Sequence, residues 1–397
     1  MAKRILIIGG GFAGFWAAIA ARRVAKSAAE ITLVSREPKL EIRPRLYEAK
    51  PDRLAVEIPP HLSKVDVNFV CGQAVGLDTT AKLVTIDDRK CLAYDRLIVA
   101  TGSRMCRPPV PGAAEAHSVD TQAEAIKFDQ RLEEIAREVE EPTIAVVGAG
   151  FTGIELSLEL RDRLVAHGAT EAAERLHIVL IDRSDVVGPE LGLGPRSEIE
   201  HALQSARVEL RLNATITALA SSLVSFADGS VLSADAVVLA TGMRASPFAD
   251  KVPGERDQLG RIIVGADLRA PAAPEVFVAG DAAAADTGDG HRALQSCQHA
   301  LQIGRVAGEN AARDLLGMPC VPYSQLNYVT CLDLGRSGAV RTQGWDRRVE
   351  LTGSEAKALK QKINTKLIYP PADGGADALL ASSTIDIVKR YEIDGSR

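Results

Sequence analysis

Two glycine motifs of the same design lie about 140 residues apart in this chain of 397 residues. Each follows a short apolar run, residues 5–8 or 143–147, and each opens a helical pattern. In such a unit the glycines allow a tight turn, the approach of a pyrophosphate and close packing of the helix on the strand. The N-terminus of the helix then directs its N–H groups at the phosphates. The sequence therefore predicts two dinucleotide-binding domains.

The predicted elements repeat in the same order after each motif. A helix and a second strand follow the first motif at 15–24 and 31–34, and the second motif at 154–165 and 177–181. About 90 residues after each motif an apolar run ends in Ala-Thr-Gly, at 100–102 and 240–242. A further strand at 276–279 ends in Gly-Asp, and a long helix is predicted over 293–316. We expect an α/β fold with two three-layer Rossmann-like domains.

Composition excludes several other classes of protein. With 46% hydrophobic and 25% charged residues, the chain is neither disordered nor fibrous. A net charge of -5 offers no attraction to nucleic acid, so no nucleic-acid partner is expected. Six cysteines without a Cys-x-x-Cys pair predict a reducing, cytoplasmic location and no disulfide framework.

The glycines from 9 to 14 interrupt the apolar N-terminus, which argues against a signal peptide. No run of about 20 apolar residues predicts a spanning helix, and no metal site is predicted.

Acidic residues after the predicted strands indicate how the coenzymes are held. Asp182 ends the second strand of the second unit, where a carboxylate accepts a ribose 2′-OH and repels a 2′-phosphate, so NADH is favoured. Arg183 beside it leaves NADPH open. In the first unit Ser35 stands at this position, followed by Arg36, and its ribose contact is unassigned. Asp281 is interpreted either as the N-cap of an Ala-rich helix or as a ligand of coenzyme hydroxyls, and both roles are compatible.

Together these motifs, in this order over residues 3–315, resemble the two-dinucleotide-binding flavoprotein reductases. The resemblance implies FAD at the first site and NAD(P)H in a second domain that is inserted into the first. It implies FAD-domain segments at 1–113 and 249–318, an NAD(P)H domain at 114–248, and a small α+β domain at 319–397 through which a homodimer is expected. Asp281 would lie by the FAD ribitol and pyrophosphate.

The candidate FAD residues are Gly9, Gly11, Phe12, Ala13, Gly14, Ser35, Arg36, Arg45, Ala100, Thr101, Gly102, Gly280, Asp281, Gln298 and His299. The candidate NADH residues are Gly148, Gly150, Phe151, Thr152, Gly153, Asp182, Arg183, Thr241 and Gly242.

Within that family, the segment 43–48 resembles type II NADH:quinone oxidoreductases. It carries their Pro-x-Leu-Tyr-Glu pattern where disulfide reductases have a redox cysteine pair, which argues against dithiol chemistry. Gln298 and Gln302 match the Gln-x-x-x-Gln segment that those enzymes place near the flavin. Because residues four apart lie on one helix face, an ordinary polar face is the alternative interpretation. Glu155 matches a glutamate at the nicotinamide–flavin junction and is the candidate proton handler. Its alternative role is to complement the helix N-terminus. For Cys297 and His299 two roles remain possible, packing in the core and a function beside the flavin.

The C-terminal region departs from the membrane-bound type II enzymes. A helix is predicted over 354–364, with Ala356, Leu359 and Ile363 on one narrow stripe and Lys357, Lys360 and Lys362 elsewhere. That stripe favours core or dimer packing over membrane insertion, although peripheral membrane contact is left open. We expect hydride transfer from NADH to FAD and electron transfer to a soluble quinone or similar small acceptor. The alternatives are a ferredoxin-reductase-like enzyme and a redox sensor that binds both coenzymes without turnover.

Overall fold

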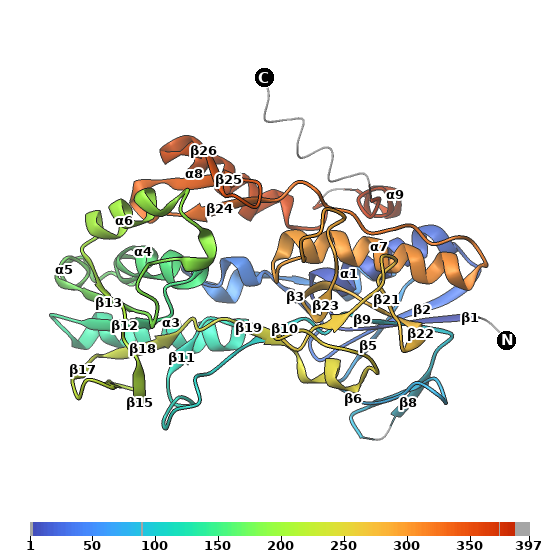
Figure 1. The fold of residues 1–397 in the computed structure, drawn as a ribbon, viewed down its shortest axis with the longest axis horizontal. Coiled ribbons are helices and arrows are strands. Elements are labelled where there is room, and N and C mark those ends of the chain that lie inside the picture. Colours follow the sequence, from blue (N-terminus) through green and yellow to red (C-terminus); the bar gives the residue numbers. More distant parts are fainter. Residues whose placement is uncertain (1–2, 89, 373, 386–397) are drawn as a thin grey trace.

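The computed structural model describes residues 3–88, 90–372 and 374–385. Two parallel sheets lie side by side, and C-terminal elements extend along one side of both (Figure 1). The first sheet has the order β21-β22-β9-β1-β2-β5, parallel except for β21. Its strands are β1 (Lys3–Ile8), β2 (Ala29–Ser35), β5 (Asn68–Cys71), β9 (Arg96–Val99), β21 (Arg269–Ala270) and β22 (Ala273–Val278).

The second sheet is parallel throughout and has the order β11-β18-β12-β13-β14. The strands are β11 (His117–Ser118), β12 (Thr143–Val147), β13 (His177–Ile181), β14 (Val208–Arg211) and β18 (Ala236–Leu239). Strands β12 and β13 have the bounds that the sequence predicts. In each sheet the glycine motif follows the central strand, β1 or β12, at the carboxyl edge where α/β proteins bind ligands.

Both faces of each sheet are covered, which explains the continuous apolar runs of the strands. Ile144 and Val146 of β12 pack on the helical side, whereas Ala145 and Val147 pack against a three-stranded meander. Helices α1 (Phe12–Ala25) and α7 (Cys297–Leu315) lie over one face of the first sheet (Figure 1). The helices of the second unit are α3 (Gln122–Glu138), α4 (Phe151–Ala166), α5 (Thr170–Arg175) and α6 (Arg196–Ser205). The meanders are β6 (Ala74–Asp78), β7 (Leu83–Ile86), β8 (Lys90–Ala93) and β15 (Ile216–Ala220), β16 (Leu223–Phe226), β17 (Val231–Ser233).

The second unit is inserted between β9 and β22 of the first sheet, as the family resemblance implies. The chain passes outward along β10 (Ser103–Met105) and returns along β19 (Met243–Ala245), and these two strands pair antiparallel. The exact domain boundaries stay a prediction. The remaining short elements are β3 (Lys39–Glu41), β4 (Ala55–Glu57), α2 (Pro59–Ser63), β20 (Ile262–Ile263) and β23 (Ala283–Ala284).

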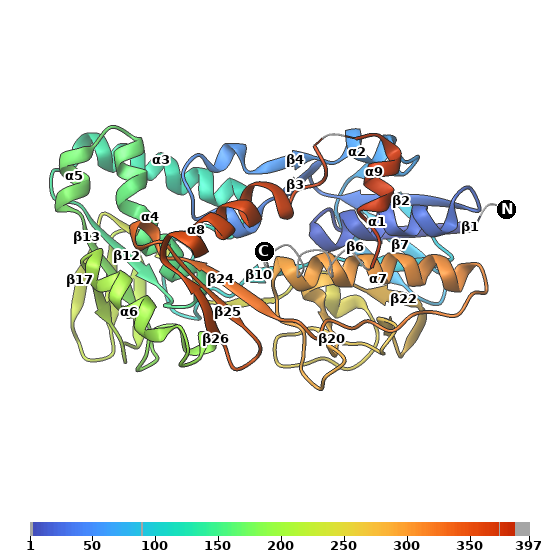
Figure 2. The same cartoon turned by 90° about the horizontal axis from the view of Figure 1, so that it is seen from above.

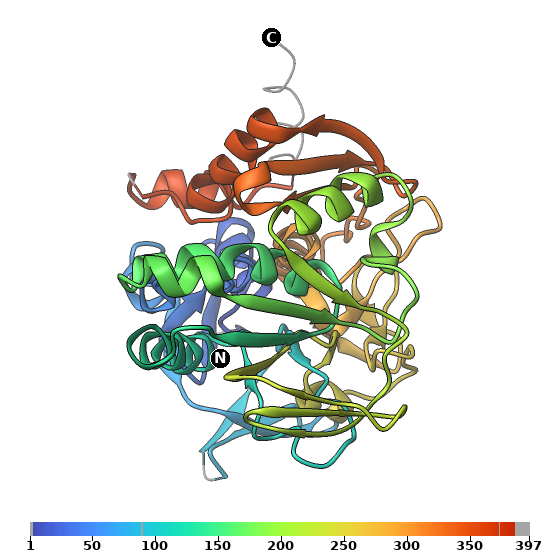
Figure 3. The same cartoon turned by 90° about the vertical axis from the view of Figure 1, so that its left-hand side faces the viewer.

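The C-terminal part is a small α+β layer, which confirms the predicted fold class (Figures 2 and 3). Its antiparallel sheet packs beside α4, and α9 lies near α1. Among the described residues, no helix combines the length and apolarity needed to cross a bilayer. Residues 386–397 of the predicted C-terminal domain lie outside the described residues. The elements are β24 (Val329–Asp333), β25 (Ala339–Gln343), β26 (Arg348–Thr352), α8 (Gly353–Lys362), the π-helix Ile363–Leu367 and α9 (Ala376–Ala381).

Three local predictions are wrong, the first because of a local helix cap and the other two because of tertiary contacts. Helix α7 begins at Cys297 instead of residue 293, because Ser296 is extended and its Oγ accepts from the backbone N of His299 at 3.4 Å. No helix follows Asp281, because the alanines after it pair as β23, so an N-cap role is excluded. Lys360 does not lie on the outer face of α8: it is buried, whereas Leu359 is only half-buried.

Glycines set the distance between α1 and α7. A Cβ on Gly304 would lie 2.3 Å from the carbonyl oxygen of Ala13, and one on Gly308 would lie 2.1 Å from that of Ala17. Both distances are far below van der Waals contact, so only glycine permits this approach. The close packing holds the N-termini of both helices against the carboxyl edge of the first sheet.

We predict that Gly308→Ala lowers the free energy of unfolding by about 1–3 kcal/mol, because the added methyl group forces two packed helices apart. Thermal denaturation followed by circular dichroism measures the effect. Gly375→Ala is the matched control, because Gly375 has φ -78° and open space around its Cβ position. Equal melting temperatures for both variants would contradict this account of the α1–α7 contact.

Candidate coenzyme and catalytic site

The first glycine loop leaves open space at the N-terminus of α1. Gly14 packs so closely that its Cβ would lie 1.8 Å from the carbonyl oxygen of Gly9. At Gly11, by contrast, no atom lies within 4 Å of the Cβ position, and no side chain caps the helix. Unpaired N–H groups of a helix N-terminus are an anion-binding arrangement. The loop therefore has the geometry that a coenzyme pyrophosphate requires.

Three of the eleven buried side-chain atoms without a partner among the described residues belong to candidate flavin-side residues. Among the described residues, Thr101 Oγ1, His299 Nε2 and Gln302 Oε1 are buried and lack a hydrogen bond. A buried polar atom left unpaired costs about 1–3 kcal/mol, so such atoms usually have a partner. All three belong to residues that the sequence assigns to the flavin side. The residues present therefore fit a bound flavin nucleotide.

Asp281 lies beside two polar residues that the sequence analysis missed. Ser103 Oγ donates to Asp281 Oδ2 at 2.6 Å. Removal from solvent raises the pKa of Asp281, while the Ser103 hydroxyl and the Arg43 guanidinium act in the opposite direction. Arg43 is itself paired with Asp120. Nothing in the local sequence pattern indicates Ser103 or Arg43, because their partners are distant in the chain.

The second glycine loop carries the predicted acidic residue beside it. Asp182 Oδ2 accepts from the backbone N of Ala149 at 2.7 Å, and its Oδ1 accepts from that of Ser184 at 2.8 Å. In the first unit, the Ser35 hydroxyl lies 2.6 Å from the Cβ position of Gly10. Both side chains thus end their strands next to a glycine loop, one as a carboxylate and the other as a hydroxyl.

The arginines predicted near the coenzymes differ in their surroundings. Arg36 and Arg183 are exposed. Arg45 instead forms an ion pair with Glu48 at 2.6 Å and donates to the Tyr369 hydroxyl at 2.9 Å. The guanidinium of Arg45 thus links the segment 43–48 to the C-terminal part of the chain, and its predicted contact with a coenzyme stays a prediction.

A buried ion pair lies where the inserted unit meets the C-terminal sheet. Lys360 Nζ of α8 is 2.7 Å from Glu155 Oε1 of α4, and their residues are 5% and 3% exposed. The backbone N of Asp333 donates to the same carboxylate oxygen at 2.9 Å, and Lys360 also donates to the carbonyl of Cys331 at 3.0 Å. Glu155 therefore does not complement the N-terminus of its own helix. Sequence analysis missed Lys360, because a lysine on an amphipathic helix is ordinarily solvated.

Burial gives this pair unusual proton affinities. It raises the pKa of Glu155 to about 7, although Lys360 and the Asp333 N–H stabilise the carboxylate. For Lys360, burial lowers the pKa, but the neighbouring Glu155 outweighs that effect and the net shift is upward. The pair therefore combines a lysine whose pKa is raised with a carboxyl group whose pKa is near neutral pH.

Aromatic rings and a second ion pair enclose the buried pair. Lys360 Nζ lies 5.8 Å from the ring centre of Tyr47 and 5.4 Å from that of Phe151. The Tyr47 hydroxyl donates to Asp333 Oδ2 at 3.4 Å, and Lys357 Nζ lies 2.5 Å from Asp333 Oδ1. The Tyr47–Glu48 segment of the first unit, α4 and α8 thus converge on one polar cluster.

The N-terminus of α7 brings together the predicted acceptor-side residues. Gln302 is buried and donates to the carbonyl of Ile385 at 3.1 Å, while Gln298 is half-buried. The His299 ring stacks on Tyr328 with centroids 5.2 Å apart, and burial lowers its pKa to about 4, so the imidazole is neutral. Burial raises the pKa of Cys297 to about 11, which keeps it a thiol. All six cysteines are free thiols.

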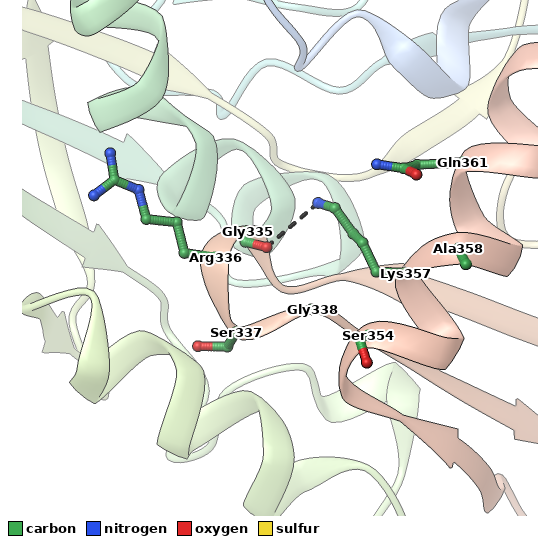
Figure 4. A pocket seen from close by; sticks show the side chains of 8 residues that line it. All are labelled: Gly335, Arg336, Ser337, Gly338, Ser354, Lys357, Ala358 and Gln361. Carbon is green, nitrogen blue, oxygen red and sulfur yellow. Dashed lines mark hydrogen bonds between the residues drawn. The ribbon is translucent and has the colours of Figure 1, made fainter.

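Two cavities are lined by residues of the C-terminal part, and the second also by residues of α1 and α7. One, of about 260 Å³, lies between the loop 335–338 and α8, where Lys357 reaches toward the Gly335 carbonyl (Figure 4). The other, of about 150 Å³, is lined by Trp16, Arg305 and Tyr369 among others. Its lining residue on α7, Arg305, lies three residues after Gln302 and seven after Gln298.

Comparisons with known proteins agree with this arrangement. Residues 3–304 match the profile of the pyridine nucleotide-disulphide oxidoreductase family. An NADH dehydrogenase-like protein of Mycobacterium tuberculosis is 39% identical over 390 residues, covering 96% of this chain and 98% of the relative. A type II NADH:quinone oxidoreductase of the same organism is 30% identical over 328 residues, covering 70% and 66%. The solved sulfide:quinone oxidoreductase of Aquifex aeolicus has the same fold, with a TM-score of 0.79 at 19% identity over 99% and 94% of the chains. The chain therefore belongs to the pyridine nucleotide-disulphide oxidoreductase family, as a flavin-dependent NAD(P)H oxidoreductase that is NADH dehydrogenase-like.

Proposed function

We propose that the protein oxidises NADH through FAD and passes the two electrons to a quinone or similar small acceptor. The observation that carries the proposal is the buried Glu155–Lys360 pair between the two dinucleotide units and the C-terminal layer. An ionisable pair in such a place is an expensive feature for stability alone, and it suits proton handling at a redox centre. The names of the similar NADH dehydrogenase-like and NADH:quinone proteins support the same reaction.

In this proposal the chain's residues bind and orient the coenzymes. The glycine loops after β1 and β12 would hold the two pyrophosphates, and Asp281 and Asp182 would accept coenzyme hydroxyls. Thr101, His299 and Gln302 would give their unpaired polar atoms to the flavin nucleotide. When bound, FAD accepts a hydride from NADH and returns two electrons to the acceptor. Bound coenzymes packed against each other would exclude water from that transfer.

Proton balance assigns Glu155 its role. NADH supplies two electrons and one proton as hydride, whereas a quinone needs two electrons and two protons to become a quinol. A group that is protonated near neutral pH can supply the second proton. Glu155 and Glu159 both have a pKa of about 7, and Glu155 is the candidate because it forms the buried pair with Lys360. Lys360 would hold the carboxylate in place after the proton has left.

An acceptor panel tests the proposal. Purified, flavin-loaded protein is assayed for NADH oxidation with menadione, with ferredoxin and with thioredoxin. We expect rapid turnover with menadione alone. Turnover with ferredoxin alone would favour a ferredoxin-reductase-like enzyme, and flavin that NADH reduces but no acceptor reoxidises would favour a sensor.

We predict that Asp182→Asn raises the ratio of kcat/KM for NADPH to that for NADH by about tenfold or more. A hydrogen bond to a charged group contributes about 1.5–3 kcal/mol, and the amide also no longer repels a 2′-phosphate. Asparagine still offers an oxygen to the N–H of Ala149, which preserves the loop. Asp185→Asn, an exposed carboxylate in the same segment, is the control. An unchanged ratio would remove Asp182 as the ribose ligand.

We predict that turnover with menadione falls as pH rises through about 7, because only protonated Glu155 donates the second proton. Glu155→Gln should lose this inflection and slow turnover by roughly 10²-fold. Reduction of ferricyanide, which takes electrons without protons, should stay near the wild-type rate.

Lys360→Met should move the inflection to higher pH, because the buried carboxylate loses the cation that favours its ionised form. The control is Glu159→Gln, one turn further along α4, for which the inflection should remain. If the inflection survives in Glu155→Gln and vanishes in Glu159→Gln, the proton donor is Glu159 and the role proposed for Glu155 is wrong.

A further inference from the structure

The two glycine motifs differ in what lies next to their middle glycine, Gly11 or Gly150. Beside Gly11 the space at the N-terminus of α1 is open, whereas beside Gly150 the Cβ position lies 2.7 Å from Oε1 of Glu190. The same carboxylate oxygen accepts from the backbone N of Phe151, in the first turn of α4, at 3.0 Å. A carboxylate of the chain thus occupies, in the second motif, the position that stays open in the first.

That position is the one where the proposed function requires the NADH pyrophosphate. Helix N-terminal N–H groups bind phosphate and carboxylate by the same attraction, so one N–H cannot serve both anions at once. We propose that Glu190 is an internal competitor of the coenzyme pyrophosphate: its carboxylate occupies the α4 N-terminus and leaves when NADH binds. Glu190 therefore weakens the binding of pyrophosphate-containing ligands. This inference rests on the proposed function.

The backbone around Glu190 is anchored while its side chain reaches solvent. Glu190 lies in the 3-10 turn Pro189–Leu191, between Gly188 and Gly192, whose φ angles of 56° and 72° favour glycine. The N of Gly188 donates to the carbonyl of Ala149 at 2.8 Å, and Arg347 Nη2 donates to the carbonyl of Glu190 at 3.4 Å. Because Glu190 is exposed, rotation of its side chain is enough to move the carboxylate into water.

A purely structural role predicts something different. A carboxylate at a helix N-terminus stabilises the helix, so a structural Glu190 would affect melting and leave ligand affinity unchanged. Helix α1 has the same motif and forms without such a carboxylate, which shows that the motif does not require one. Glutamine separates the two roles, because its oxygen can still accept from the Phe151 N–H while the negative charge is gone.

The test is isothermal titration of the flavin-loaded protein with ADP-ribose, which carries the pyrophosphate and does not reduce flavin. Glu190→Gln should bind ADP-ribose about two- to fivefold more tightly than wild type, the range expected for one charge at an exposed helix terminus. The gain should shrink at high salt. Adenosine, which lacks phosphate, should bind both proteins equally. Glu200→Gln removes the same charge from an exposed position on α6 and should match wild type.

The inference is wrong if Glu190→Gln binds ADP-ribose no more tightly than wild type. It is also wrong if Glu200→Gln binds ADP-ribose as tightly as Glu190→Gln does, or if Glu190→Gln gains as much affinity for adenosine as for ADP-ribose. If NADH still reduces the flavin in these proteins, only the role of Glu190 is wrong and the proposed function is unaffected. If neither protein binds ADP-ribose and NADH leaves the flavin oxidised, both the inference and the proposed function fail.

Discussion

The buried ion pair of Glu155 and Lys360 is the interaction on which the rest of the site depends. Two charges removed from water cost several kcal/mol each unless they are paired and hydrogen-bonded. Here the Asp333 N–H and the Cys331 carbonyl complete the pair, so the inserted unit and the C-terminal layer must meet in one arrangement to satisfy it. The pair fixes the end of α4 that follows the second glycine loop, and burial of that carboxyl group raises its pKa to about 7, although Lys360 favours the ionised form.

The two dinucleotide units use one design with different details. Each has a glycine loop after a central strand and a polar side chain at the end of the next strand, Ser35 or Asp182. The first unit keeps its helix N-terminus open, and three candidate flavin-side residues carry unpaired polar atoms, as suits a coenzyme that stays bound. The second covers its helix N-terminus with the exposed Glu190, as suits a ligand that must exchange at each turnover. The difference follows the proposed roles of FAD as resident coenzyme and NADH as substrate.

Much of the fold was predictable because it depends on local patterns. Strands β12 and β13 and both glycine loops follow from apolar runs and glycine spacing, whereas the insertion of one unit into the other was implied by the family resemblance. The position of Asp182 was predictable for the same reason. Lys360, Ser103, Arg43 and Glu190 were not, because each acts through a partner far away in the sequence. The apolar stripe of α8 even placed Lys360 on the wrong face, since only its ion pair with Glu155 makes its burial favourable.

The central claim is that two coenzymes meet beside the Glu155–Lys360 pair so that hydride passes directly from NADH to flavin. Anaerobic titration of the purified, flavin-loaded protein with NADH, followed by the visible absorbance of the flavin, tests this most directly. We expect complete bleaching at an equimolar amount of NADH, within the mixing time of a stopped-flow instrument or shortly after it. Flavin that stays oxidised in excess NADH, while dithionite bleaches it, would contradict the account.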